Sequence, residues 1–150
     1  MNNLSQAKQI LSNGGYTCVL CCNDKVYSST KRGVKPLLEF LEDENDYSYY
    51  SAADKVVGKA AAFLYVLIGI KEVYAEVISS HALNVFESRG IDVSYEIICE
   101  SVINREKTGM CPMESAVMKM DDEVEALEAI KNKLIELETA SRNYTKKVLT

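Results

Sequence analysis

The stretch that decides the fold is residues 51–70, which read SAADKVVGKAAAFLYVLIGI. Ser51 and Asp54 have the Ser-x-x-acid spacing of a capping box, so the sequence predicts a central helix over residues 52–69. From Ala60 onward the apolar residues surround nearly the whole helix, which is typical of a helix covered on several sides. The apolar run 60–70 is too short to cross roughly 30 Å of hydrocarbon, so we expect a core helix and no membrane partner.

Turn and capping signals divide the rest of the chain around this helix. Before it we predict a helix at 4–11, a hairpin of strands 16–22 and 26–30, a helix at 35–42 and a loop at 42–50. After it we predict a strand at 73–78, a helix at 80–89, a strand at 91–100, a short helix opened by Pro112 and an amphipathic helix at 121–140. The alternation of helix and strand after residue 52 predicts parallel pairing with right-handed crossovers. The chain is therefore expected to be an α/β protein.

Length and composition indicate one self-sufficient domain. The 150 residues are 47% hydrophobic and 26% charged, close to the average of globular chains. A formal net charge of -5 argues against a surface that neutralises phosphates, so nucleic acid is not an expected partner. No secretory signal is present at the N-terminus, which predicts a cytoplasmic protein. Five cysteines in such a chain are expected to be reduced thiols.

Two segments carry a resemblance to a known family. Residues 53–62 (ADKVVGKAAA) and 108–114 (TGMCPME) resemble the hallmark stretches of an uncharacterised bacterial family, domain of unknown function 1893. The resemblance covers nearly the whole chain and implies a cytidine deaminase-like fold, a three-layer α-β-α sandwich with a mixed sheet. On this basis residues 1–120 form the deaminase-like domain. Residues 121–150 add a C-terminal amphipathic helix and tail, packed on the same domain or on a partner subunit. The family implies no established activity.

The resemblance does not extend to the zinc site of the deaminases. Zinc deaminases open one helix with His (or Cys)-x-Glu and the next with Pro-Cys-x-x-Cys. At the equivalent positions this chain reads Asp54-Lys55-Val56 and Ser79-Ser80-His81-Ala82. Asp54 and His81 together fall one short of the three protein ligands that a catalytic zinc requires. The sequence therefore predicts no metal site, no cofactor and no zinc-dependent deamination.

The predicted start of the central helix supplies the first candidate site residues. Asp54 and Lys55 would bring an acid and an ammonium group to the free N–H groups of a helix N-terminus. The alternative is an ordinary helix cap beside a surface lysine. Gly58 is costly inside a helix, which suggests that a backbone or a ligand approaches closely there. Close packing on the sheet is the alternative explanation for Gly58.

A second candidate is Cys111, which stands just before Pro112 at the start of a predicted short helix. The helix dipole can lower a thiol pKa at such a position and favour a nucleophilic thiolate. The alternative is a partly buried cap residue, with Glu114 three positions later completing a capping pattern. Glu114 is also a candidate ligand-binding residue at this helix start. We expect Cys111 to be the most reactive of the five thiols, because the other four lie in predicted strands.

Further candidates lie near the starts of the other helices. Ser79 and Ser80 would line a site at the helix that begins near residue 80. His81, the only histidine, would carry any imidazole acid–base role there, although a lone histidine is commonly structural. An anion-binding loop before the Pro112 helix would use Arg105, Thr108 and Gly109, for which ordinary solvated charge is the alternative.

Three functional hypotheses follow. In the first, a metal-free deaminase-fold protein binds a small polar, nucleotide-like molecule where the three helix starts converge. In the second, the chain is a non-catalytic regulatory or assembly protein, and its C-terminal helix forms a homodimer. In the third, it is a thiol-dependent enzyme that uses Cys111. A water-filled convergence of the three helix starts would favour chemistry, whereas a filled one would favour assembly.

Overall fold

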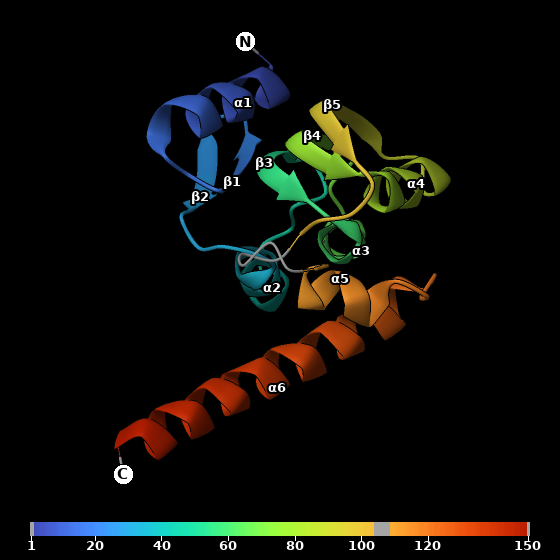
Figure 1. Ribbon diagram of the computed structural model, residues 1–150. Helices are drawn as coiled ribbons and strands as arrows, with labels where there is room; N and C mark the ends of the chain where they lie inside the picture. Colours follow the sequence, from blue (N-terminus) through green and yellow to red (C-terminus); the bar gives the residue numbers. More distant parts are fainter. Residues whose placement is uncertain (1, 104–108, 150) are drawn as a thin grey trace.

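The structure is a computed structural model that describes residues 2–103 and 109–149. Within these residues it is a mixed α/β protein with one sheet of five strands and six helices (Figure 1). In chain order the elements are α1 (Asn3–Gly14), β1 (Cys18–Cys22), β2 (Lys25–Ser29), α2 (Lys35–Glu42), β3 (Ser51–Val57), α3 (Lys59–Ile68), β4 (Glu72–Ser79), α4 (Ser80–Ser88), β5 (Asp92–Cys99), α5 (Pro112–Val117) and α6 (Glu123–Leu149).

The sheet has the strand order β2-β1-β3-β4-β5 and is mixed. Strand β1 is antiparallel to both of its neighbours, with Leu20 opposite Tyr27 of β2 and Ala52 of β3. Strands β3, β4 and β5 are parallel, and Ala52, Val73 and Val93 stand side by side across them. The carboxyl ends of these three strands therefore lie together at one end of the sheet, where ligands of open α/β sheets usually bind.

The prediction of one continuous helix over 52–69 is wrong in its first third. Residues Ser51–Val57 form strand β3, which lies between β1 and β4, and helix α3 begins only at Lys59. The capping-box pattern misled because its serine has another partner: Ser51 Oγ donates to Glu72 Oε2 at 2.7 Å. Gly58 separates the two elements as the N-cap of α3, with extended backbone (φ -97°, ψ -178°). The other predicted elements are present, with α6 running on to the end of the described chain.

Helices cover both faces of the sheet. On one face α1 packs on β1 and β3 through Ala7 and Leu11, which contact Val19, Cys21 and Ala53. The larger core lies on the other face, where α2, α3 and α4 pack, and its largest fully buried side chains include Tyr65, Phe63 and Phe86. In Figure 1, α1 lies above the sheet, and α2, α3 and α5 lie below it.

Helix α6 forms a further layer beneath α3 and α5. Its residues Ala126 and Ile130 are fully buried, and Arg89, the C-cap residue of α4, donates to Glu123 Oε2 at 3.0 Å. Helix α6 therefore closes the core over α3. Figure 1 shows the C-terminal part of α6 extending past the body of the domain.

Candidate functional site

The start of α3 is closed by a side chain from α5. The carboxylate of Glu114 accepts hydrogen bonds from the backbone N–H of Lys59 (2.6 Å, to Oε2) and of Ala60 (2.9 Å, to Oε1). Glu114 is 3% exposed, so these bonds are shielded from water. A carboxylate on two free N–H groups at a helix N-terminus is also favoured by the helix dipole. Two backbone N–H groups that a ligand could use at the start of α3 are thus bonded to a side chain of the same protein.

Gly58 is where this carboxylate comes closest to the backbone. A Cβ atom on Gly58 would lie 2.4 Å from both Cδ and Oε1 of Glu114, a distance that real Cβ atoms do not reach. A close approach at Gly58 is therefore present, but it is made by a side chain and not by the backbone, the ligand or the sheet packing that the sequence suggested. Its location in a helix interior was wrong, and the approaching group is Glu114, not the ligand that the sequence also allowed. The predicted capping pattern of Glu114 with Cys111 is likewise corrected, because the carboxylate bonds to α3.

Asp54 belongs to a buried polar cluster that the sequence did not reveal. Its Oδ2 accepts a hydrogen bond from the Tyr65 hydroxyl at 2.6 Å, and the Cys18 Sγ lies 3.2 Å from the same hydroxyl oxygen. Burial raises the pKa of Asp54 to about 7. The hydrogen bonds from Tyr65 and from the Val56 backbone lower this pKa, but the effect of burial is larger. Burial also raises the pKa of Tyr65 and of Cys18 well above their ordinary values, and the nearby Asp54 charge adds to both shifts.

Lys55 does not join Asp54 at a helix start. It is half-buried in strand β3, and its backbone N–H donates to the Thr17 carbonyl at 3.1 Å. Because β3 is a strand, the predicted convergence of an acid, an ammonium group and helix N–H groups at residues 54–55 does not form. The lysine at the start of α3 is Lys59, whose Nζ donates to the Met118 carbonyl at 2.8 Å.

The start of α4 is capped locally. Ser79 is fully buried, and its Oγ accepts from the Ala82 backbone N–H at 3.1 Å. Ser80 Oγ donates to the Glu100 carbonyl at 3.4 Å, which links α4 to the segment after β5. His81 is half-buried in the first turn of α4. Two of the three predicted ligand groups at this helix start thus already have protein partners.

Cys111 stands at the N-cap of α5, as predicted, with Pro112 in the first turn. It is half-buried against the core, and its backbone N–H donates to the Val102 carbonyl at 2.9 Å. Its side chain makes no capping hydrogen bond, and α5 has only six residues. Of the strand cysteines, burial raises the pKa of Cys21 and of Cys99, and the negative Glu114 adds to the shift of Cys99.

The predicted anion-binding loop lies mostly outside the described residues, which is the case for Arg105 and Thr108. Gly109 is described and exposed, with no atom within 4 Å of a Cβ built on it. Among residues 2–103 and 109–149, no group of three or more His, Cys, Asp and Glu side chains is placed to hold a metal ion. No helix in the described part of the chain is long and apolar enough to cross a membrane.

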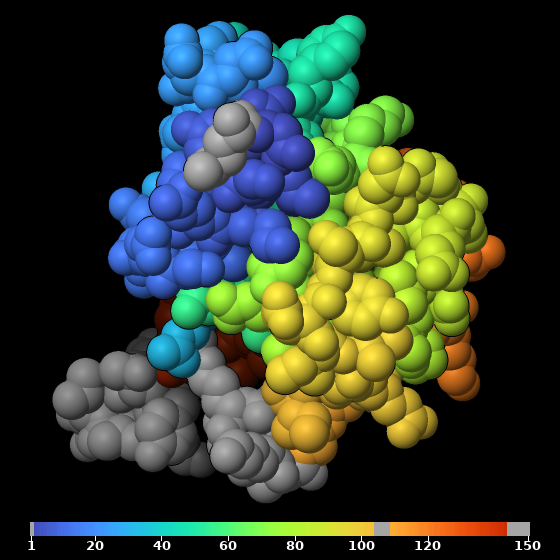
Figure 2. Space-filling model, turned by 90° about the horizontal axis from the view of Figure 1, so that it is seen from above, coloured from blue at the N-terminus to red at the C-terminus, as the bar shows by residue number. Residues whose placement is uncertain are grey.

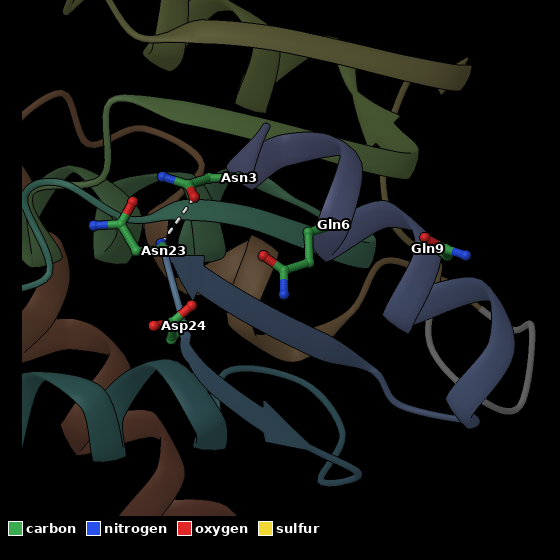
Figure 3. Close-up of a pocket in the computed structure, with 5 residues that line it drawn as sticks. All are labelled: Asn3, Gln6, Gln9, Asn23 and Asp24. Atoms are coloured by element: carbon green, nitrogen blue, oxygen red, sulfur yellow. Dashed lines mark hydrogen bonds between the residues drawn. The ribbon is translucent and has the colours of Figure 1, made fainter. Parts of the chain in front are cut away.

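A polar depression lies at the end of the sheet near the β1–β2 turn, away from the predicted site (Figure 3). Its volume is about 540 Å³, and its lining residues are Asn3, Gln6, Gln9, Asn23 and Asp24. The Asn23 backbone N–H donates to Asn3 Oδ1 at 2.9 Å, so part of the lining serves to join α1 to the turn. Asn23 has a positive φ of 54°, a conformation that asparagine tolerates in tight turns.

Comparison with known proteins shows that the chain resembles members of one described family over most of its length. Residues 6–134 match the family model described as TM1506, domain of unknown function (DUF1893). A crystal structure of a DUF1893 family protein (TM1506) from Thermotoga maritima is similar to this one, with a TM-score of 0.80 and 29% sequence identity. The similarity covers 88% of this chain and 90% of that chain. No curated protein matches.

Proposed function

Because the chain belongs to the family of domain of unknown function 1893, we propose a role consistent with a closed site: a non-catalytic protein that works by associating with other protein chains. In this proposal the protein forms homo-oligomers, and its deaminase-type site is a structural element. The observation that carries the proposal is the position of the Glu114 carboxylate. It accepts hydrogen bonds from two backbone N–H groups at the N-terminus of α3, and Glu114 is itself buried.

The proposal includes the cytidine deaminase-like fold that the family resemblance implies. Three layers around a mixed sheet support this assignment, together with the order β2-β1-β3-β4-β5 and a helix after each of β3 and β4. Because α3 begins at Lys59, the segment equivalent to the deaminase His-x-Glu moves from residues 54–56 to Gly58-Lys59-Ala60. This segment and the α4 start at Ser79 contain one histidine, His81, and no cysteine or glutamate.

The other two hypotheses stay predictions. A small polar, nucleotide-like ligand would have to displace Glu114 from α3 or bind beside it. A thiol reaction at Cys111 would need a general base, and the only histidine, His81, has no described hydrogen bond to that thiol within residues 2–103 and 109–149. A cytoplasmic location likewise remains a prediction from the sequence.

Sedimentation velocity across a wide concentration range tests the association. We expect species heavier than the 16.7 kDa chain, with a weight-average mass that rises with concentration. A thermal-shift screen with cytidine, common nucleotides and zinc runs in parallel, and we expect no saturable stabilisation. A chain that stays monomeric and is stabilised saturably by one of these compounds would refute the proposal in favour of ligand binding.

A further inference from the structure

The edge strand β5 exposes apolar side chains that no described element covers. Tyr95, Ile97 and Ile98 are 41%, 59% and 47% exposed, although they lie in a regular strand. An edge strand also presents a row of unpaired backbone N–H and C=O groups, and proteins commonly protect such edges with lysine or proline. Neither residue occurs in β5.

The apolar surface continues from this edge onto one face of the sheet. Val56, Val77 and Ile97 stand side by side across β3, β4 and β5. Val56 is 47% exposed. Helix α1 packs on β1, β3 and part of β4, whereas Tyr95, Ile97 and Ile98 of β5 stay exposed. Figure 2 shows the β5 segment, in yellow, forming the surface beside α1, in dark blue.

The two edges of the sheet carry opposite charges. Along β5 and the residue after it, Asp92, Glu96 and Glu100 are all exposed, and residues 92–100 contain no lysine or arginine. The opposite edge, β2, begins with Lys25 and is followed by Lys31 and Arg32, all exposed, and residues 25–32 contain no acid. Asp24 in the preceding turn is the nearest acid in sequence, and Lys31 is paired with Glu39, so Lys25 and Arg32 are the basic groups that this edge offers. Val26 in β2 is 40% exposed, so the β2 edge combines an apolar group with the basic Lys25 and Arg32, whereas the β5 edge combines apolar groups with acids.

We propose that the β5 edge of one copy pairs with the β2 edge of a second copy and continues the sheet from one molecule into the next. This inference rests on the proposed function and names its interface. Strands β2 and β5 run in the same direction, so a copy added along the sheet in the same orientation pairs them in parallel. In this arrangement Lys25 lies near Asp92, and Arg32, which follows β2, lies toward Glu100, which follows β5.

Such a contact is heterologous, because each copy uses two different surfaces. Heterologous contacts close into rings or grow into open assemblies, so the complexes should exceed a dimer as concentration rises. Salt should weaken them, because the exposed charges are screened. An isologous dimer through β5 alone would bring the acidic edges of two copies together, which disfavours that arrangement.

The test uses two variants that each block one edge. The first carries Ile97→Lys and Glu100→Lys on the β5 edge, and the second carries Lys25→Glu and Val26→Glu on the β2 edge. All four positions are exposed, so both variants should keep the wild-type circular dichroism and unfolding curve. Each variant alone should sediment as a monomer. Their mixture should form a 1:1 heterodimer, because the first retains an intact β2 edge and the second an intact β5 edge.

Glu128→Lys, an exposed change on α6 far from both edges in sequence, is the matched control and should assemble like wild type. Assembly of wild type that neither variant reduces would overturn this interface and leave the proposed association standing. A dimer of the second variant alone would show pairing of β5 with itself and overturn the heterologous contact. A monomeric wild type would overturn both the interface and the proposed function.

Discussion

Replacing Asp54 with asparagine should remove much of the pH dependence of stability near neutrality. The carboxyl group is buried with hydroxyl and N–H donors around it, and its pKa rises from 3.8 to about 7 on folding. A folded-state pKa above the unfolded value means that folding favours the protonated acid. The contribution of Asp54 to stability is therefore greatest below about pH 4, falls as the pH rises toward 7, and is level above that.

At about 1.4 kcal/mol per pKa unit, wild type should lose roughly 3 kcal/mol of unfolding free energy between pH 5 and pH 8 through this group. Asp54→Asn keeps an oxygen that can accept from Tyr65 but cannot ionise, so its loss over the same interval should be smaller by about this amount. Urea unfolding of both proteins at pH 5 and pH 8 measures this difference in unfolding free energy. Asp24→Asn, at an exposed position, is the matched control. Equal pH dependence in wild type and Asp54→Asn would refute the reasoning.

Three further changes test the closed site and its surroundings. Gly58→Ala should displace the Glu114 carboxylate, because a Cβ at residue 58 would lie 2.4 Å from it. The free energy of unfolding in urea should fall by about 2–4 kcal/mol. A fall below about 0.5 kcal/mol, which is typical of a surface substitution, would contradict the contact. Truncation after Met120 should yield a destabilised, aggregating chain and not a folded monomer, because it removes the fully buried Ile130. A truncated chain that unfolds cooperatively with wild-type stability would show that α6 is not needed for the core. With limiting iodoacetamide, peptide mapping of the folded protein should find Cys111 labelled faster than the buried Cys18. Equal labelling of the two thiols would show that Cys111 is an inert cap residue.

Most of the fold could be predicted from local patterns. The Lys35–Glu42 helix, the hairpin and the alternation of strand and helix after residue 70 were visible from turn residues, capping residues and apolar periodicity. Strand β3 was missed because the Ser51 and Asp54 spacing imitates a helix cap. The signal that could have corrected it was Gly58, which is better explained as a break between two elements than as a costly residue inside one helix.

The candidate site could be predicted only in part, because its decisive contact joins residues 55 positions apart. The sequence marks the starts of α4 and α5 and the presence of α3, although it places the start of α3 near residue 52 instead of at Lys59. This much is local information. Whether the free N–H groups at the start of α3 bind a ligand, water or the protein's own side chain depends on where α5 lies, and no periodic pattern encodes that position. Glu114 reads as a local cap for its own helix, and only the packing of α5 against α3 turns it toward Lys59 and Ala60. The same long-range packing explains why a glycine is required at residue 58: the carboxylate occupies the space that any side chain there would need.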